Sequence, residues 1–341
     1  MSRLPAILAV DGGGSKIDAV LLRKDGAVLG AARVATTDFD QNGGDVHMGQ
    51  VLDAVAAASV DAGLSADRMP VAQLGVYCLA GADFPVDDRR IDRWLRIREV
   101  TDERLVRNDT FAVLRAGTDR DWGVGVVCGY GINCSGVAPD GRITRFPAVG
   151  PISGDWGGGN DIGEAGLWHA IRSEDGRGPK TALQTTIPAA LGYRRPFQVL
   201  TALHTGRLDV DRIAQLPPVV FETATGGDAV ARSIVDRQAD EVVALAATAI
   251  RRLRMTRLDV DVVLGGGIFR TDDAAFFDRI RDGVVHVAPA ATITVLSDPP
   301  VIGAAQLGLD RVGATRAAHV RARAALTHDR LAAHIHRERK E

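Results

Sequence analysis

The run Asp11-Gly12-Gly13-Gly14-Ser15-Lys16 is the first stretch whose residue types could do chemistry, because it interrupts an apolar, strand-like run. Residues without a Cβ let the backbone turn several N–H groups toward one anion. Gly12, Gly13, Gly14, Ser15 and Lys16 are therefore candidate phosphate ligands. Asp11, at the mouth of the turn, suits a magnesium ion held through water. By itself, the stretch is equally typical of an ordinary hairpin turn.

The residues after Lys16 indicate which kind of glycine loop this is. A Walker-type loop requires a helix directly after its glycines. Residues 17–34 instead contain strand-like apolar runs on either side of the hairpin signal Asp25-Gly26. The glycine run therefore joins strand to strand, which excludes a Walker loop.

Residues 123–146 repeat this pattern. A strand-like run leads to Gly129-Tyr130-Gly131, a second strand follows around Asn133, and an Asp140-Gly141 turn leads to a third strand. Two copies of one module predict two similar α/β lobes whose glycine hairpins face each other across a cleft. A nucleotide would place its phosphates between the two hairpins, so Gly129, Tyr130, Gly131 and Asn133 are further candidate nucleotide ligands.

Asp109 is the candidate general base. It lies where a strand-like run ends at residue 108 and an apolar helical pattern begins at residue 111. Such a position presents a carboxylate to a cleft at the edge of a sheet. Asp is also a preferred helix N-cap, so the spacing alone leaves both roles open.

Two further glycine-rich stretches extend the candidate site. Residues 150–166 combine Gly154, Asp155, Trp156 and Asp161, and carboxylates beside an aromatic ring suit a polyol. An acidic surface loop is the alternative there. An amphipathic helix over residues 228–255 precedes a β-rich run that ends in Gly265, Gly266 and Gly267. These glycines permit close approach of adenosine, or they form a strand turn without a ligand.

Composition and charge limit the class of protein. The chain has 341 residues, 46% of them hydrophobic and 25% charged, which is enough for two domains with their own cores. A formal net charge of −2 argues against a nucleic-acid partner, and no apolar span predicts a transmembrane helix. The three cysteines fit neither a disulfide framework nor a zinc spacing, which favours a cytoplasmic location.

Taken in order, these motifs resemble the BadF/BadG-type ATPase and N-acetylglucosamine kinase family, within the superfamily of acetate and sugar kinases, heat-shock chaperones and actin. The resemblance rests on residues 9–16, Asn108-Asp109, and residues 128–134, 154–166, 264–269 and 299–309. It implies an α/β fold with two lobes, each a mixed five-stranded sheet flanked by helices. ATP and Mg²⁺ would lie between lobes that close on the substrate.

The resemblance also implies roles for individual residues. Asp109 matches the family's catalytic Asp, and the adjoining Asn108 would contact the acceptor. The family places a sugar-contacting Asn where Asp38 stands in this chain, and Asn42 takes that role if the loop is shifted. Asp161 matches the family's sugar-binding Asp only if one residue is deleted. Because a carboxylate accepts but does not donate, Asp38 favours a hydroxyl-rich or cationic acceptor.

These observations predict an ATP-dependent kinase that transfers the γ-phosphoryl group to a sugar hydroxyl. The favoured acceptor is an amino sugar such as N-acetylglucosamine or glucosamine, with another hexose or a cyclitol as alternatives. An ATPase activator would need cysteines that ligate an iron–sulfur cluster, and a sugar sensor would lack a base or a magnesium ligand. Both stay open as alternative classes.

The expected organisation has three parts. Residues 1–117 form the N-terminal lobe, residues 118–312 the C-terminal lobe, and residues 313–341 a basic C-terminal helix. For this helix a solvated surface is favoured over a metal site at His334 and His336. The resemblance further implies a homodimer.

Overall fold

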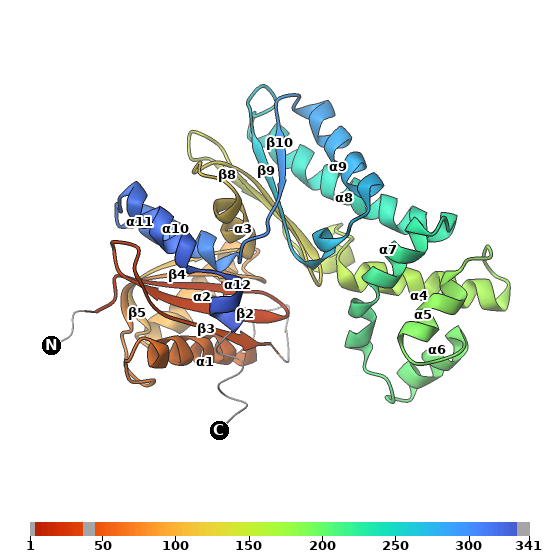
Figure 1. Cartoon of the computed structure of the whole chain (residues 1–341), viewed down its shortest axis with the longest axis horizontal. Coiled ribbons are helices and arrows are strands. Elements are labelled where there is room, and N and C mark those ends of the chain that lie inside the picture. The colour runs from red at the N-terminus through yellow and green to blue at the C-terminus, as the bar shows by residue number, and fades with distance from the viewer. Residues whose placement is uncertain (1–3, 37–44, 333–341) are drawn as a thin grey trace.

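The computed structural model describes residues 4–36 and 45–332, which form two lobes around two β-sheets (Figure 1). Asp38 and Asn42, predicted to contact the acceptor, lie outside the described residues, as do His334 and His336. Within the described ranges, no helix is both long enough and apolar enough to cross a membrane.

The N-terminal sheet brings the ends of three parallel strands to one edge. Its strands are β1 (Ile7–Gly12), β2 (Lys16–Leu22), β3 (Val28–Ala35), β4 (Ala72–Leu79) and β5 (Thr101–Arg107). They lie in the order β3-β2-β1-β4-β5, with β1, β4 and β5 parallel and β2 antiparallel to both of its neighbours. Residues that follow β1, β4 and β5 therefore lie close together at one edge.

Helices cover both faces of this sheet, which explains the nearly continuous apolar sequence of its central strand. Leu8 and Val10 of β1 are buried in one cluster with residues of α1 (Asp45–Asp61) and α2 (Pro85–Ile97). Ile7 and Ala9 point to the other face, toward α3 (Asp109–Gly117) and α10 (Val301–Arg311). Successive side chains of a strand alternate between faces, so a strand covered on both sides must be apolar throughout.

The C-terminal sheet repeats the same topology. Its strands are β6 (Gly123–Cys128), β7 (Ile132–Val137), β8 (Ile143–Arg145), β9 (Asp261–Gly265) and β10 (Thr292–Val295), in the order β10-β9-β6-β7-β8. β6 pairs antiparallel with β7 and parallel with β9, as β1 does with β2 and β4. The predicted fold of two lobes on mixed five-stranded sheets is thereby confirmed.

Both Asp-Gly pairs form the predicted hairpin turns. Gly26 and Gly141 have left-handed φ values of 81° and 82°, which glycine adopts without steric cost. In the first turn, the N–H of Arg23 donates a hydrogen bond to the carbonyl of Ala27. In the second turn, the N–H of Ala138 donates to the carbonyl of Arg142. These turns fix the register of β2 with β3 and of β7 with β8.

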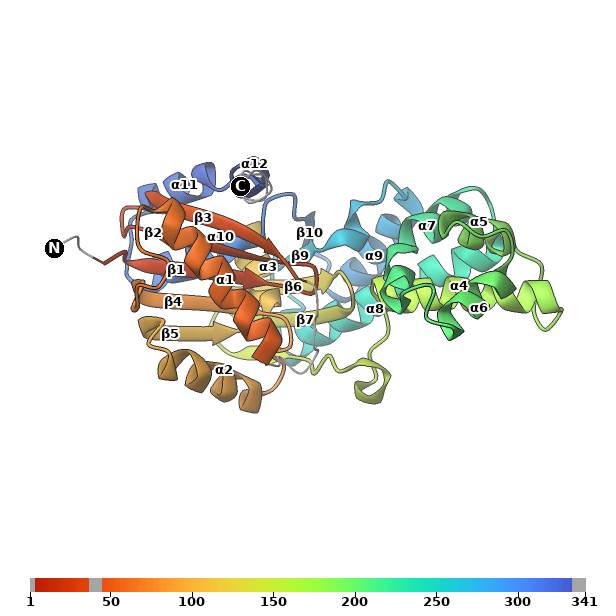
Figure 2. The ribbon, with the colours of Figure 1, turned by 90° about the horizontal axis from the view of Figure 1, so that it is seen from below.

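A helical part between β8 and β9 enlarges the C-terminal lobe. It contains α4 (Gly159–Asp175), α5 (Leu183–Ala190), α6 (Pro196–His204), α7 (Pro217–Thr225) and α8 (Ala229–Arg252), with short 3₁₀ turns at Gly150–Ser153 and Val210–Gln215. A third such turn, Gly267–Arg270, and α9 (Ala274–Val287) follow β9. The predicted long helix is α8, which begins where Asp228 accepts a hydrogen bond from the N–H of Ala231. Figure 2 shows α4 to α7 at the end of the molecule remote from the N-terminal sheet.

The chain returns to the N-terminal lobe before the expected boundary at residue 312. After β10, helix α10 packs against α3 and lies over β1 and β4 (Figure 1). The approach is close, since a Cβ on Gly303 would lie 1.8 Å from the carbonyl oxygen of Ala112. By packing, residues 301–312 therefore belong to the N-terminal lobe, because the apolar face of α10 is covered there.

Up to residue 332, where the described part of the chain ends, the C-terminal segment forms two packed helices in place of one solvated basic helix. They are α11 (Arg316–Ala325) and α12 (His328–Ala332). Leu326 and Leu331 are 1% and 0% exposed and join the same core cluster as Ile7. Arg330 also forms a 2.7 Å ion pair with Asp61 at the end of α1. The basic composition predicted a solvated face and missed these apolar anchors.

We predict that Leu326→Ala lowers the stability of the N-terminal lobe. Truncation of a fully buried leucine costs about 2–5 kcal/mol of unfolding free energy. Thermal unfolding should show a clear drop in Tm, with little change for the control Val320→Ala, since Val320 on α11 is 62% exposed. Equal effects of the two substitutions would show that the C-terminal helices do not anchor through this core.

Candidate active site

The first glycine hairpin places three charged side chains on one face of the N-terminal sheet. Asp11 lies opposite Asp18 in the β1–β2 pair, and Lys16 is two residues from Asp18, so all three point to the same face. Lys16 Nζ donates to Asp18 Oδ2 at 2.9 Å, and Arg33 Nε donates to Asp18 Oδ1 at 2.6 Å. Asp18, which the sequence analysis did not single out, is therefore the immediate partner of Lys16.

Asp11 is a buried carboxylate at the end of β1. It is 7% exposed, and burial is the main cause that raises the pKa of Asp11 to about 7. Lys16 and Arg33 oppose this rise in pKa, whereas Asp18 adds to it. A nearby cation favours the charged form of such a carboxylate. Asp11 therefore fits the predicted magnesium site.

The structure removes one of the two roles that the spacing left open for Asp109, that of helix cap. Asn108, rather than Asp109, caps α3, because its Oδ1 accepts from the N–H of Thr110 at 3.1 Å. Asp109 is the first residue of the helix, and its pKa is raised to about 8 by burial, then by the charges of Asp11 and Asp83. The carboxylates of Asp109 and Asp11 thus lie near each other, at the ends of β5 and β1.

The second hairpin is the meeting point of the glycine motifs in the C-terminal lobe. The carbonyls of Gly129 and Tyr130 accept from the N–H groups of Gly159 and Asn160 at the start of α4. On the other side, a Cβ at Gly266 would lie 2.2 Å from the carbonyl oxygen of Cys128. Residues 128–131, 157–160 and 265–267 therefore form one contiguous backbone surface.

Four glycines at this junction face open space. A Cβ added at Gly13, Gly129, Gly131 or Gly267 would meet no atom of the described residues within 4 Å, and none of the four has a left-handed φ. Open space beside the backbone is what a nucleotide requires, since its phosphates bind main-chain N–H groups at close range. Gly13 comes from one lobe and the other three from the second, so these residues fit ATP.

The predicted sugar loop is held in place by its own carboxylates. Asp161 Oδ2 accepts from the N–H of Gly157 at 2.7 Å, and Asp155 bonds to the hydroxyl of Ser153 and to the N–H of Gly150. One face of Trp156 is covered by the guanidinium of Arg237, at 3.9 Å from the ring centroid. Gly154 has a left-handed φ of 83° and ends the 3₁₀ turn before this loop.

Asp83 lies at the same junction, although no sequence motif pointed to it. This residue follows β4, is 6% exposed, and accepts hydrogen bonds from the side-chain amides of Asn108 at 3.0 Å and Asn133 at 2.8 Å. Burial raises the pKa of Asp83 to about 6. Asn133, predicted to contact the nucleotide, thus directs its amide toward Asp83. An Asp at the carboxyl end of a parallel strand was the available signal, as for Asp11 and Asp109.

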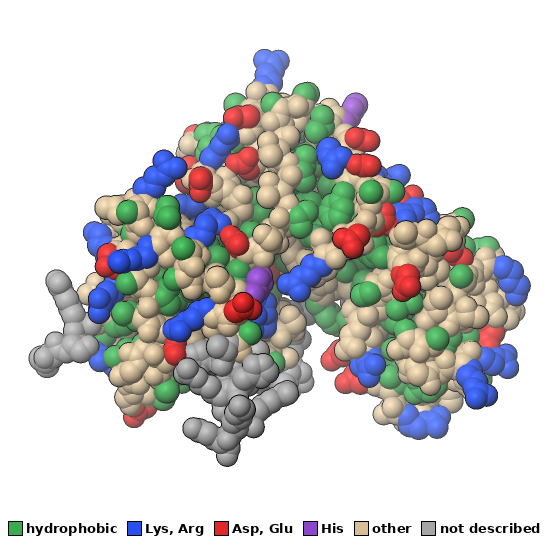
Figure 3. All heavy atoms as spheres, in the orientation of Figure 1, with side chains coloured by type: hydrophobic (Ala, Val, Ile, Leu, Met, Phe, Trp, Pro, Cys, Tyr) green, Lys and Arg blue, Asp and Glu red, His purple; other side chains and the backbone are tan. Residues whose placement is uncertain are grey.

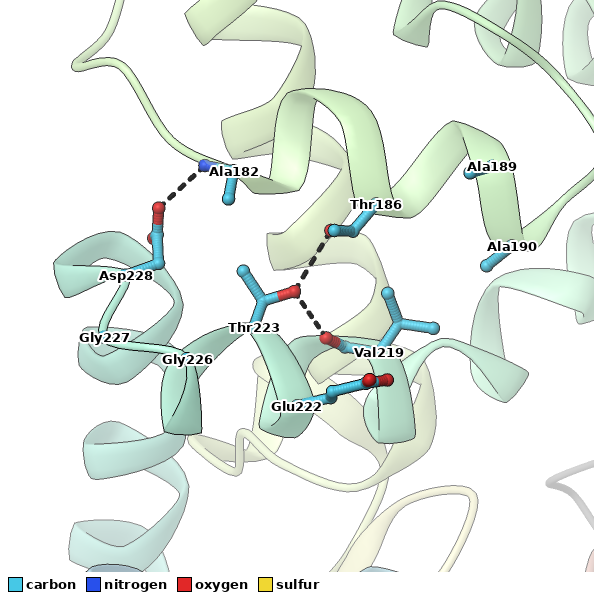
Figure 4. A pocket seen from close by; sticks show the side chains of 10 residues that line it. All are labelled: Ala182, Thr186, Ala189, Ala190, Val219, Glu222, Thr223, Gly226, Gly227 and Asp228. Atoms are coloured by element: carbon cyan, nitrogen blue, oxygen red, sulfur yellow. Dashed lines mark hydrogen bonds between the residues drawn. The ribbon is translucent and has the colours of Figure 1, made fainter.

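A separate hollow of about 670 Å³ lies between α5 and α7, and Figure 4 shows its lining. Its polar groups bond to one another: Thr223 Oγ1 donates to the carbonyl of Val219, and Asp228 accepts from the N–H of Ala182. No predicted site residue lines it. We therefore place the candidate active site at the junction of the lobes, where the surface is hollowed between the N-terminal lobe and the helical part (Figure 3).

Two sheets of identical topology, with glycine hairpins and buried carboxylates at their junction, define a two-lobed ATPase of the sugar kinase and actin type. Comparison with known proteins narrows the class. The sequence model of the BadF/BadG/BcrA/BcrD ATPase family matches residues 8–308, so the chain belongs to that family.

Named relatives are similar over most of their length. An N-acetyl-D-glucosamine kinase from Dictyostelium discoideum is 26% identical over 314 residues, which is 89% of this chain and 97% of the relative. An N-acetylmuramic acid/N-acetylglucosamine kinase from Clostridium acetobutylicum is 25% identical over 300 residues, 87% of this chain and 96% of the relative. The structure of a candidate N-acetylglucosamine kinase from Chromobacterium violaceum superposes with a TM-score of 0.68 at 21% identity, covering 90% of this chain and 99% of the other.

We predict that Gly13→Ala and Gly131→Ala weaken ATP binding without destabilising the protein. The added methyl groups contact no atom in the part of the chain that the structure describes, but they occupy the space where phosphates would approach the backbone. Calorimetry should show an increase in the Kd of ATP of about tenfold or more. Gly49→Ala on α1 is the control, because Gly49 is equally open but belongs to no predicted ATP motif. An unchanged Kd for both variants would remove these glycines from the ATP site.

Proposed function

We propose that this protein is an ATP-dependent sugar kinase with Asp109 as its catalytic base. The observation that carries the proposal is the placement of Asp109, half-buried between β5 and α3 and close to the carboxylates of Asp11 and Asp83. Phosphoryl transfer needs chiefly positioning, neutralisation of phosphate charge and a base near the acceptor. The named relatives, all kinases of amino sugars, support the same activity.

Each side chain has a defined task in the proposed reaction. Asp109 accepts the proton of the acceptor hydroxyl as its oxygen attacks the γ-phosphorus in line, and ADP leaves. A base works best when its pKa lies near the working pH, and the raised pKa of Asp109, about 8, meets that condition. Asp11 would hold Mg²⁺ through water, and the ion when bound would neutralise charge on the phosphates. Gly12 to Lys16 and Gly129 to Gly131 contact the phosphates, and Gly265 to Gly267 the adenosine.

For the acceptor we propose an amino sugar, with N-acetylglucosamine first because both named relatives act on it. Asp155, Trp156 and Asp161, with Asp38 and Asn42, would contact its hydroxyls and its amino substituent. Asn108 has little capacity left for direct contact. Its amide oxygen accepts from the N–H and the hydroxyl of Thr110, and one amide hydrogen bonds to Asp83.

The cysteines favour a kinase over an iron–sulfur ATPase activator. Cys78, Cys128 and Cys134 are all buried, with no exposed surface, and burial raises the pKa of each thiol. Cluster ligands must be thiolates that reach the cluster, and these three favour the neutral thiol. Free buried thiols also fit a reducing compartment, so we propose a cytoplasmic enzyme. The homodimer implied by the family resemblance stays a prediction.

A panel of acceptors tests the proposed activity. We expect N-acetylglucosamine or glucosamine to increase ADP release from ATP-Mg²⁺ by at least about tenfold over acceptor-free hydrolysis, since bound acceptor replaces water at the phosphorus. Glucose, N-acetylmannosamine and cyclitols complete the panel. Sugar-independent hydrolysis would indicate an ATPase activator, and binding without turnover a sensor.

We further predict that Asp109→Asn lowers the activity of the enzyme and raises its stability. Loss of the base should lower kcat by about 10²–10⁴-fold while the Kd of ATP stays nearly unchanged. An Asp with a raised folded-state pKa destabilises the folded protein increasingly as pH rises from about 4 toward about 8. Asn removes this penalty, so Tm should rise relative to wild type more at pH 8.5 than at pH 5.

The control for this substitution is Asp102→Asn, an exposed carboxylate on the same strand region. It should change neither kcat nor the pH dependence of Tm. Near-wild-type turnover of Asp109→Asn would rule out Asp109 as the base, whatever its effect on stability.

A further inference from the structure

Asp83 connects the two lobes through a single carboxylate oxygen. Its Oδ1 accepts from Asn108 Nδ2 at 3.0 Å, on the N-terminal lobe, and from Asn133 Nδ2 at 2.8 Å, on the C-terminal lobe. Asp83 and Asn108 are 6% and 2% exposed. Hydrogen bonds to a charged acceptor that is withdrawn from water are strong and directional, so this contact fixes the amides of both partners.

On the N-terminal side, the contact sets the orientation of the Asn108 amide. With Nδ2 bonded to Asp83, Oδ1 faces α3 and accepts from the N–H of Thr110 at 3.1 Å and from its hydroxyl at 2.7 Å. These bonds cap α3, whose first residue is Asp109. The position of Asp109 therefore depends on an amide that Asp83 holds.

On the C-terminal side, the contact reaches the second glycine hairpin. Asn133 is the second residue of β7, directly after that hairpin, and its Oδ1 accepts from the N–H of Cys134 at 2.7 Å. A second bond between the lobes lies alongside, joining Thr110 Oγ1 and Ser135 Oγ at 2.7 Å. Asp109 and the hairpin 129–131 are thus linked by two short chains of hydrogen bonds.

We propose that Asp83 is a positioning residue that places Asp109 when the two lobes meet. The proposal rests on the proposed function for its catalytic part. Contact between Asp83 and Asn133 completes the hydrogen-bonding of Asp83, which orients Asn108 and so sets the start of α3. Misplacement of a catalytic group by about 1 Å can cost on the order of 100-fold in rate.

The geometry attributes this role to the acceptor oxygen rather than to the charge of Asp83. Both amides bond to Oδ1, so an asparagine at this position still offers an oxygen to both. The charged groups that act on Asp83 are Asp87 at the start of α2, Arg145 on β8 and Asp155 in the sugar loop. Arg145 has its own partner, because it forms two hydrogen bonds with Asp88, at 2.7 and 3.1 Å.

The chain offers matched variants for a test by steady-state kinetics. We expect Asp83→Ala to lower kcat by about 10- to 100-fold, with the KM of ATP changed by less than about threefold. Asp83→Asn should restore kcat to within about threefold of wild type, because it keeps the acceptor oxygen. Asp88→Ala removes a different lobe-bridging pair without touching Asn108, and it should leave kcat within about threefold of wild type.

Two kinetic outcomes would overturn the proposal. If Asp83→Asn loses as much activity as Asp83→Ala, the charge acts and the acceptor oxygen does not. If Asp88→Ala loses as much activity as Asp83→Ala, any weakening of the contact between the lobes is enough to lower kcat. Asp83 would then have no specific role in positioning Asp109.

Thermal unfolding separates a failure of this inference from a failure of the proposed kinase activity, because it needs no substrate. We expect non-additive Tm changes in the series Asp83→Ala, Asn133→Ala and the double variant, with the second substitution costing less once the first is present. Additive changes would show that Asp83 does not join the lobes and would overturn the inference even in an active enzyme. If non-additivity is found while wild type phosphorylates no acceptor, the link stands and the proposed function falls.

Discussion

The packing of three carboxylates at one edge of the N-terminal sheet is the constraint on which the rest of the site depends. Asp11 lies at the end of β1, and Asp83 and Asp109 follow the adjacent strands β4 and β5. Partial or full burial raises the pKa of each, to about 7, 6 and 8. Like charges withdrawn from water oppose folding near neutral pH. The arrangement persists because the apolar clusters on both faces of the sheet hold these strands in register, and because Asp83 is satisfied by two amides.

Helix α3 connects the two lobes, because it packs against both sheets. It carries Asp109 at its first position, contacts strands of both sheets, and packs against α10 on its other side. Small residues allow such close contact: a Cβ on Gly125 of β6 would lie 2.5 Å from the carbonyl oxygen of Thr110, as one on Gly303 would crowd Ala112. A helix wedged in this way cannot shift without moving both sheets, since packed interiors deform little. Helix α3 therefore couples the position of Asp109 to both sheets.

The carboxylates of the predicted sugar loop have a different role from those of the N-terminal sheet. They mostly accept hydrogen bonds from the backbone: Asp161 accepts from the N–H of Gly157, and Asp155 accepts from the N–H of Gly150. Such bonds hold a glycine-rich loop in one shape, which a binding surface for a small polyol requires before it can discriminate between hydroxyls. The stacking of Arg237 on Trp156 adds a cation beside this loop. This loop of the C-terminal lobe is thus preformed, and we propose that it recognises the acceptor.

The local sequence was enough to predict the strands and turns and the module that is repeated in the two lobes. Alternating apolar runs, two Asp-Gly turns and two glycine hairpins predicted the two lobes, because turn residues and strand periodicity act over a few neighbours. The roles of Asn108 and Asp109 at the start of α3, the return of α10 to the first lobe and the packing of α11 and α12 were beyond that reach. Asp83 shows why. Its partners lie 25 and 50 residues away, and only the folded chain brings one carboxylate within 3.0 Å of two amides from different lobes. A contact between side chains so distant in sequence leaves no local pattern, so tertiary structure alone decides it.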